Sequence, residues 1–186
     1  NHEPTMDELN GFDRVILAIG AHNMDLPMHV ENSNVVSSWD ILNGQEVSGK
    51  CVVLGGGLVG AETAEYLANK GLEVSIVEMM DKIATQASET VLPLMEEDFA
   101  KHNVQKFVNT RVSEIKDNVI YAVNTKDETN VEIVADTIVN ALGSKKNVFD
   151  DSQLSVPFTY VGDCSGERTA DIASAIRTGY KDTNEI

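Results

Sequence analysis

The sequence has only two cysteines, few basic residues and no long apolar run. Cys51 and Cys164 lie far apart and form neither a C-x-x-C pair nor a zinc-ligand pattern, and the four histidines also lack metal-ligand spacing. No stretch is apolar enough to cross a membrane or typical of a signal peptide. These absences predict a protein without a bound metal, located in the reducing cytoplasm.

Positive charge is also scarce, because 14 Lys and Arg stand against 30 Asp and Glu, a formal net charge of −16. Nucleic acids and anionic membrane surfaces bind basic patches, so neither is an expected partner. A nucleotide ligand remains compatible, since backbone N–H groups can bind its phosphates locally. The 186 residues, 42% of them hydrophobic, suffice for one domain, or for one domain and part of another.

The most informative stretch runs from Lys50 to Glu78 and has the order strand, glycine turn, helix, strand. An apolar run over 51–54 predicts the first strand, and an alternating pattern over 72–77 predicts the second. The helix between them has apolar residues at three- and four-residue steps, and Gly71 predicts its end. These apolar residues are Ala61, Ala64, Leu67 and Ala68.

The turn fills the pattern G-x-G-x-x-G with Gly55, Gly57 and Gly60. In dinucleotide-binding folds the first glycine permits the tight turn, the second lets a pyrophosphate approach, and the third lets the helix pack against the strand. The helix start at Leu58 and Val59 adds unpaired N–H groups and the positive end of the helix dipole. All five residues are therefore predicted to bind a cofactor.

Glu78 follows the second strand about 20 residues after the first glycine, where an acid can accept hydrogen bonds from the adenosine ribose. Its charge would repel a 2′-phosphate, and the next three residues include no arginine. This favours NAD(H) over NADP(H). The alternatives are a glycine-rich turn in another kind of α/β domain and a methyltransferase that uses S-adenosylmethionine.

Beyond Glu78 the sequence predicts a helix over 90–102, with Pro93 in its first turn. The expected buried face of this helix consists of Val91, Met95 and Phe99. A strand over 104–108 follows, and then a β-meander in place of a crossover helix. The meander strands are expected over 111–115, 119–123 and 131–134.

Two further strands, predicted as buried over 15–19 and 137–141, share Asp, Ala and Gly at equal offsets and end at Gly20 and Gly143. Both place small residues where a strand leaves the sheet, the edge at which α/β folds bind ligands. The segment 21–49 is expected to be a loop-rich connection with a short helix over 38–42.

Near the end of the chain a polar loop is expected over 145–156 and a short strand over 157–161. Gly162-Asp163-Cys164 comes next, and a helix is predicted over 169–180, capped by Thr169 or Asp171. One face of this helix carries Ile172, Ala175, Ile176 and Tyr180.

Together these features resemble the two-dinucleotide flavoproteins of the pyridine-nucleotide–disulfide-oxidoreductase superfamily. The resemblance is carried by the paired Asp…Ala-x-Gly strands, the run Gly-Gly-Gly-Leu-Val-Gly-Ala-Glu at 55–62, the meander and the segment 160–164. Segments 161–164 and 170–180 are most similar to the carboxy-terminal part of NADH-dependent flavin oxidoreductases of the 2-enoate reductase and 2,4-dienoyl-CoA reductase type.

The resemblance implies an α/β fold with a Rossmann-like NAD(H)-binding domain at 48–142, a parallel sheet with a β-meander crossover. Partial FAD-domain segments at 1–47 and 143–186 would flank it. Glu62 would be the catalytic-site glutamate near the nicotinamide carboxamide and the flavin edge. Gly143 would lie beside bound NAD, and Gly20 near the domain junction.

On the FAD side, the resemblance implies that Gly162 and Asp163 bind the ribityl or pyrophosphate region, and that a helix from Ala170 points at the flavin carbonyl. The family's first glycine fingerprint, for the ADP half of FAD, does not occur in these 186 residues. We therefore expect an incomplete FAD site and a carboxy-terminal piece of a larger enzyme, inactive alone. No C-x-x-x-x-C pair supports disulfide reduction.

The expected function is that of an NADH-binding module of an NADH oxidase or enoate reductase-like flavoenzyme, which positions NADH for hydride transfer to FAD. Its expected partners are NADH and upstream domains of the same polypeptide, where the enoate reductase type carries FMN and an iron–sulfur cluster. A non-catalytic NAD(H) sensor or interaction domain is the alternative. The final substrate and the formation of a homo-oligomer are left open.

Overall fold

The computed structural model describes residues 2–166 and 172–184. The chain forms two compact units, one comprising Asn23–Gly143 and the other joining Asn1–His22 to Ser144–Ile186. The larger unit contains the glycine turn.

A five-stranded sheet lies at the centre of the larger unit, and all of its neighbouring strands are parallel. Its order is β4 (Val35–Ser37), β11 (Thr137–Asn140), β5 (Lys50–Leu54), β6 (Glu73–Val77) and β7 (Gln105–Phe107). The predicted Rossmann-like parallel sheet is thus confirmed. The predicted alternation over 72–77 is wrong, because residues 74–77 are all buried between two covered faces, as is usual in a parallel sheet.

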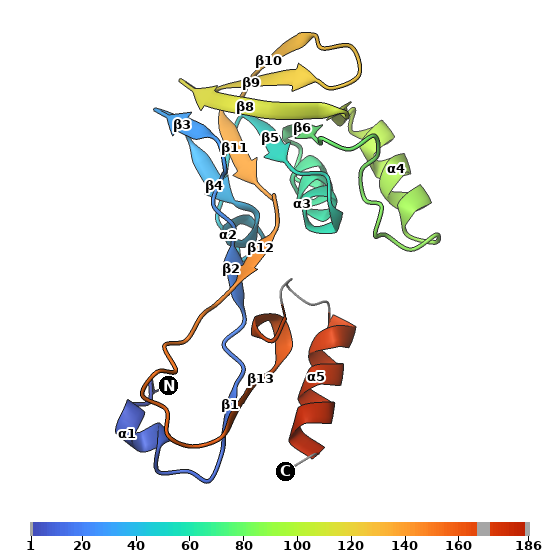
Figure 1. Ribbon diagram of the computed structural model, residues 1–186. Coiled ribbons are helices and arrows are strands. Elements are labelled where there is room, and N and C mark those ends of the chain that lie inside the picture. Colours follow the sequence, from blue (N-terminus) through green and yellow to red (C-terminus); the bar gives the residue numbers. More distant parts are fainter. Residues whose placement is uncertain (1, 167–171, 185–186) are drawn as a thin grey trace. The chain divides into compact units, whose positions relative to one another are not determined.

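Helices cover one face of this sheet (Figure 1). They are α2 (Ser38–Leu42), α3 (Leu58–Asn69) and α4 (Leu92–Lys101). The predicted apolar face of α3 is buried, and Gly71, with a left-handed φ of 86°, follows its end. On α4, Met95 and Phe99 are buried as predicted, but Val91 is exposed because it precedes the helix as its cap.

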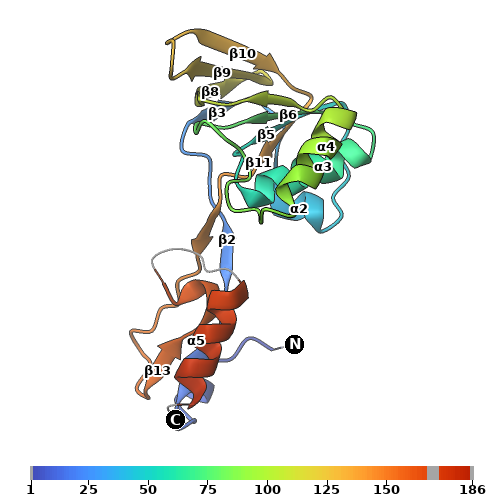
Figure 2. The same cartoon turned by 90° about the vertical axis from the view of Figure 1, so that its right-hand side faces the viewer.

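The meander covers the opposite face, so the unit has three layers (Figure 2). Strands β8 (Thr110–Lys116), β9 (Val119–Asn124) and β10 (Asn130–Val134) are antiparallel, as predicted, and replace a crossover helix between β7 and β11. Ile115, Ile120 and Ile133 pack against Val52 and Ile138 of the parallel sheet.

The segment expected as a loop-rich connection contains three strands besides the predicted α2. β3 (His29–Glu31) pairs with β8, and β4 pairs with β11, so both sheets include residues that precede position 48. The compact unit accordingly begins at Asn23. These three-residue strands have too few side chains to show a periodic pattern.

The smaller unit contains α1 (Met6–Leu9), a 3-10 turn at Gly162–Cys164 and α5 (Ile172–Asn184). β1 (Val15–Leu17) pairs in parallel with β13 (Phe158–Tyr160), and β2 (Ala21–Asn23) pairs with β12 (Ser144–Lys146), which lies at the start of the segment expected to be a loop.

Burial in the smaller unit differs from the expectation. The strand predicted over 15–19 ends at Leu17, and Ile16 and Ile19 are exposed. On α5, Ile172 and Ile176 are 81% and 68% exposed. The expected caps at Thr169 and Asp171 lie outside the described residues. The segment is helical as predicted, but the apolar residues Ile172, Ile176 and Tyr180 of α5 are exposed among the described residues.

The thiol of Cys51 is fully buried in β5, and this burial, reinforced by the charge of Asp136, raises its pKa to about 11. Alkylation requires the thiolate, so at pH 8 iodoacetamide should label Cys51 about a hundredfold more slowly than an exposed thiol. Peptide mass spectrometry before and after denaturation measures this. Equal labelling rates in the two states would show that β5 is not buried as described.

Candidate functional site

The turn after β5 and the first residues of α3 together span residues 55–60, here called the glycine corner. Gly55 has a left-handed φ of 102°, and a Cβ there would lie 2.6 Å from the carbonyl oxygen of Ala141. A Cβ on Gly60 would collide with the carbonyl oxygen of Gly55. Both positions therefore require glycine, the first for the turn and the third for the close approach of α3 to the sheet.

Gly57 is the open point of the corner. It is exposed, and no atom lies within 4 Å of the place where its Cβ would be. It caps α3 without a side-chain hydrogen bond, and Leu58 and Val59 form the first turn. Because the first N–H groups of a helix have no intrahelical acceptor, this corner offers donors and a positive dipole end to an anion.

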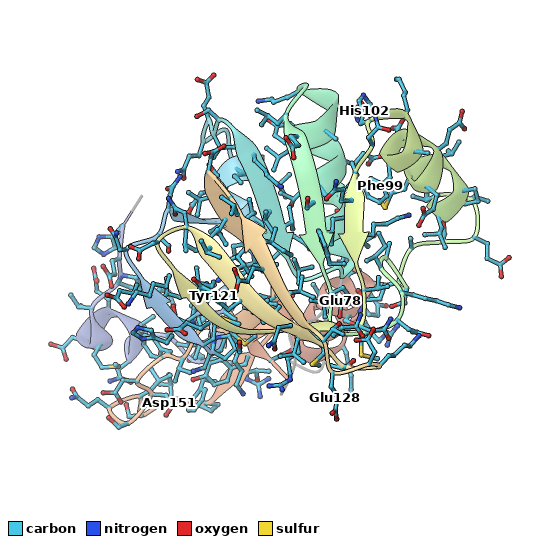
Figure 3. All side chains as sticks on the ribbon, turned by 90° about the horizontal axis from the view of Figure 1, so that it is seen from above. Glu78, Phe99, His102, Tyr121, Glu128 and Asp151 are labelled. Carbon is cyan, nitrogen blue, oxygen red and sulfur yellow. The ribbon has the colours of Figure 1, made fainter. Side chains whose placement is uncertain are left out.

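Glu78, labelled in Figure 3, directly follows β6 and is bound to the corner. Its Oε2 accepts the N–H of Gly56 at 2.6 Å, and its Oε1 accepts the N–H of Met80 at 2.8 Å. These bonds fix the carboxylate beside the corner. An ionised carboxylate has about four acceptor sites, so Glu78 retains the capacity to accept further hydroxyl donors.

Glu62 is exposed on the second turn of α3, and its side chain makes no hydrogen bond within the described part of the chain. Its charge contributes to a raised pKa at Glu65, although partial burial is the largest cause and the charge and hydrogen bond of Asp98 come next. This part of α3 and the adjacent α4 therefore presents a negative surface.

Gly143 and Gly20 both have left-handed backbone conformations, with φ of 118° and 68°, and open space where a Cβ would lie. The Gly143 carbonyl accepts the N–H of Met24 at 3.0 Å, and the Gly20 carbonyl accepts the N–H of Asn147 at 3.0 Å. Each strand thus leaves its sheet through a turn that suits glycine.

The sequence reasoning missed Asn140 at the end of β11. Its side-chain Nδ2 donates to the Met24 carbonyl at 2.7 Å, and its Oδ1 accepts the N–H of Leu142 at 3.2 Å. Asn140 is buried and holds the backbone that leads to Gly143. The sequence signal that could have identified Asn140 is a side-chain amide at the end of a mostly apolar strand, since a buried amide needs hydrogen-bond partners.

In the segment assigned to FAD by resemblance, Gly162 and Asp163 lie in the 3-10 turn after β13. The N–H of Gly162 already donates to Thr178 Oγ1 at 3.0 Å, whereas the half-buried Asp163 has no hydrogen-bond partner among the described residues. Ala170 lies outside the described residues.

In the ranges 2–166 and 172–184, no group of three or more His, Cys, Asp or Glu side chains is arranged to hold a metal ion. No helix in these ranges is both long and apolar enough to cross a membrane. A hollow of about 180 Å³ lies near the carboxyl end of α3, beside Tyr66 and Lys70, and so at the opposite end of that helix from the glycine corner. We take the corner as the candidate site because it lies at the amino end of α3, where open backbone N–H groups and the positive end of the helix dipole can meet an anion, whereas the hollow lies near the opposite end of that helix.

The parallel sheet, the glycine corner and the acid after β6 define a Rossmann-like α/β fold. The profile described as pyridine nucleotide-disulphide oxidoreductase matches residues 5–167. The chain therefore belongs to the pyridine nucleotide-disulphide oxidoreductase family.

Two curated relatives cover nearly the whole chain. A bilirubin reductase from Mediterraneibacter gnavus is 45% identical in an alignment of 179 residues that covers 94% of this chain and 28% of that protein. An NADH oxidase from Thermoanaerobacter brockii is 32% identical in an alignment of 181 residues that covers 91% of this chain and 27% of that protein. The chain thus spans less than a third of either relative.

Solved structures give the same picture. A 2-naphthoyl-CoA reductase in complex with 2-naphthoyl-CoA matches with a TM-score of 0.86 and 28% identity, covering 100% of this chain and 29% of that chain. A histamine dehydrogenase from Rhizobium sp. 4-9 matches with a TM-score of 0.87 and 19% identity, covering 100% and 32%. The second likeness shows the fold alone.

Gly57 and Gly60 should respond differently to substitution. Gly60→Ala forces a Cβ against the Gly55 carbonyl and should lower the free energy of unfolding by about 2 kcal/mol. Gly57→Ala meets open space at an ordinary φ of −64° and should change it by less than about 0.5 kcal/mol. Urea denaturation of both variants measures the difference, and equal losses would contradict the close packing at Gly60.

Proposed function

We propose that the Asn23–Gly143 unit binds NADH at the glycine corner and holds it for hydride transfer to FAD in a larger flavin-dependent oxidoreductase. The observation that carries this proposal is the pairing of an open Gly57 with a carboxylate fixed one residue away, at Gly56. A pyrophosphate fits the open backbone, and ribose hydroxyls fit the carboxylate. Leu58, Val59 and Gly60 complete the corner as cofactor-binding residues.

The preference for NADH over NADPH follows from Glu78. A 2′-phosphate would bring two negative charges against a carboxylate that backbone hydrogen bonds already hold in place. The residues that follow, Met79 and Met80, are exposed and uncharged, so they offer no compensating cation.

This chain's contribution to the reaction is binding and positioning, because bound FAD would supply the hydride-accepting ring. On the basis of their match to the family pattern, Glu62 is proposed to lie near the nicotinamide carboxamide and the flavin edge, and Gly143 beside bound NAD. The open space at Gly143 is compatible with a ligand that approaches its backbone. No side chain of the chain is required as a general acid or base.

The FAD site is proposed to be completed by other parts of the polypeptide. In this chain Asp163 offers a half-buried carboxylate without a described partner, which fits a ligand hydroxyl, and Gly20 and Gly162 lie in the same unit, with left-handed backbone conformations. Within the described residues the parallel β1–β13 sheet has two strands, and a sheet of this size needs further strands or packing to be stable. The limited coverage of the relatives supports the same proposal.

Electrons would then pass to an acceptor bound by the remaining part of the enzyme. The names of the relatives, bilirubin reductase and NADH oxidase, support oxidation of NADH coupled to reduction of an acceptor as the kind of reaction. FMN and an iron–sulfur cluster in that part, together with a cytoplasmic location, complete the proposal. Both cysteines of the chain are free, which suits a reducing compartment.

The first test replaces the acid. Glu78→Ala should raise the dissociation constant of NAD⁺ at least about tenfold, because a charged hydrogen-bond acceptor is lost. It should affect NADP⁺ less, so the preference between the two should shrink. Glu73→Ala is the matched control, since Glu73 begins the strand that Glu78 follows but is exposed and paired with Lys50. Unchanged affinity for both nucleotides in the Glu78 variant would contradict the assignment.

The second test asks whether the protein is an enzyme at all. When the full polypeptide, loaded with FAD, is mixed with NADH in a stopped-flow instrument, the yellow flavin absorbance should bleach. The bleaching should be faster with NADH than with NADPH. A protein that binds NADH without bleaching would instead be the non-catalytic sensor.

A further inference from the structure

Gly56, the middle residue of the run 55–57, has hydrogen-bond partners for both its N–H and its carbonyl group. Its N–H donates to Glu78 Oε2 at 2.6 Å, and its carbonyl accepts the N–H of Ala84 at 2.7 Å. A Cβ on Gly56 would lie 2.6 Å from Ile83 Cγ2 and 3.0 Å from Glu78 Cβ. Gly56 is therefore enclosed by the segment that follows β6, whereas the next residue, Gly57, is open.

The enclosing residues, Ile83 and Ala84, are anchored in the core. Both are buried and belong to the same apolar cluster as the inner face of α3. Ala84 is fully buried and has a φ of 50°, a left-handed conformation that is unfavourable for alanine. A strained conformation persists only where surrounding interactions hold it in place. At Ala84 these interactions are its burial and the hydrogen bond from its N–H to the Gly56 carbonyl.

The carboxylate of Glu78 joins this arrangement from the other side. One oxygen binds Gly56 and the other binds the N–H of Met80, which begins the segment that leads to Ile83. The corner, the acid and the segment 79–84 are thus connected by three hydrogen bonds, and none of the three uses an N–H group of Gly57, Leu58 or Val59.

We propose that Ile83 and Ala84 are positioning residues for the dinucleotide site. They keep the Gly56 peptide turned inward, so that the N–H groups of the following residues stay directed outward, ready for a pyrophosphate. The inference rests on the proposed function, namely that a dinucleotide binds this corner. Neither residue contacts the ligand; both act by preorganising the backbone, which reduces the ordering cost of binding.

The test removes the contact between Ile83 Cγ2 and Gly56 in the full polypeptide. Ile83→Ala should speed amide hydrogen exchange of residues 55–60 about tenfold without ligand, and should weaken binding of ADP-ribose about fivefold. ADP-ribose is a suitable probe because it has the pyrophosphate and both riboses but transfers no hydride. Ile83→Val keeps Cγ2 and should behave like the wild type.

Ile41→Ala is the matched control. Ile41 is fully buried in the same apolar cluster but lies in α2, outside the corner. It should lower the thermal stability about as much as Ile83→Ala, yet leave the exchange at 55–60 and the affinity for ADP-ribose unchanged. If Ile83→Ala does not fold, Ile83→Leu conserves volume while it removes the Cγ2 methyl group, and Ile41→Leu is then its control.

Equal exchange rates at 55–60 in the Ile83 and Ile41 variants would overturn the positioning role. Faster exchange without any change in ADP-ribose affinity would also overturn it, because the corner would then need no preorganisation. If the wild type itself does not bind ADP-ribose, the proposed function fails, while the exchange rates alone still decide whether Ile83 orders the corner.

Discussion

The hydrogen bond between the Gly56 N–H and the Glu78 carboxylate links the two parts of the site. Gly56 lies in the turn after β5, and Glu78 follows the neighbouring parallel strand, β6. The bond places an acceptor for ribose hydroxyls beside a helix start that can accept phosphate. We propose that this carboxylate gives the site its preference for an unphosphorylated ribose, a preference that the open backbone at Gly57 alone would not provide.

The layers of the larger unit bury every glycine of the glycine corner except Gly57. α3 lies close to the sheet because Gly60 has no side chain, and its inner face is fully buried between β5, β6 and α4. The meander packs on the other face of the sheet. At the carboxyl edge of the sheet the turn presents open backbone at Gly57 beside the Glu78 carboxylate, which suits a ligand recognised through phosphates and hydroxyls.

The sequence predicted the corner well because its parts are fixed by short spacings: three glycines, the helix that follows, and an acid after the next strand. It predicted the helix faces and the meander for the same reason. Strands β3 and β4, the role of Asn140 and the enclosure of Gly56 by Ile83 and Ala84 could not be read, because they depend on contacts between distant segments. Burial was overestimated at Ile16 and Ile19, since an apolar pattern does not reveal whether the covering segment lies in the same stretch of chain.

We propose that the glycine corner and Glu78 together form a binding site for an adenine dinucleotide without a 2′-phosphate. The most direct measurement is calorimetric titration of the wild-type polypeptide with ADP-ribose and with its 2′-phosphorylated form. The structure predicts that ADP-ribose binds at least about tenfold more tightly, a difference of about 1.4 kcal/mol. Equal affinity for the two, or tighter binding of the phosphorylated form, would contradict the claim.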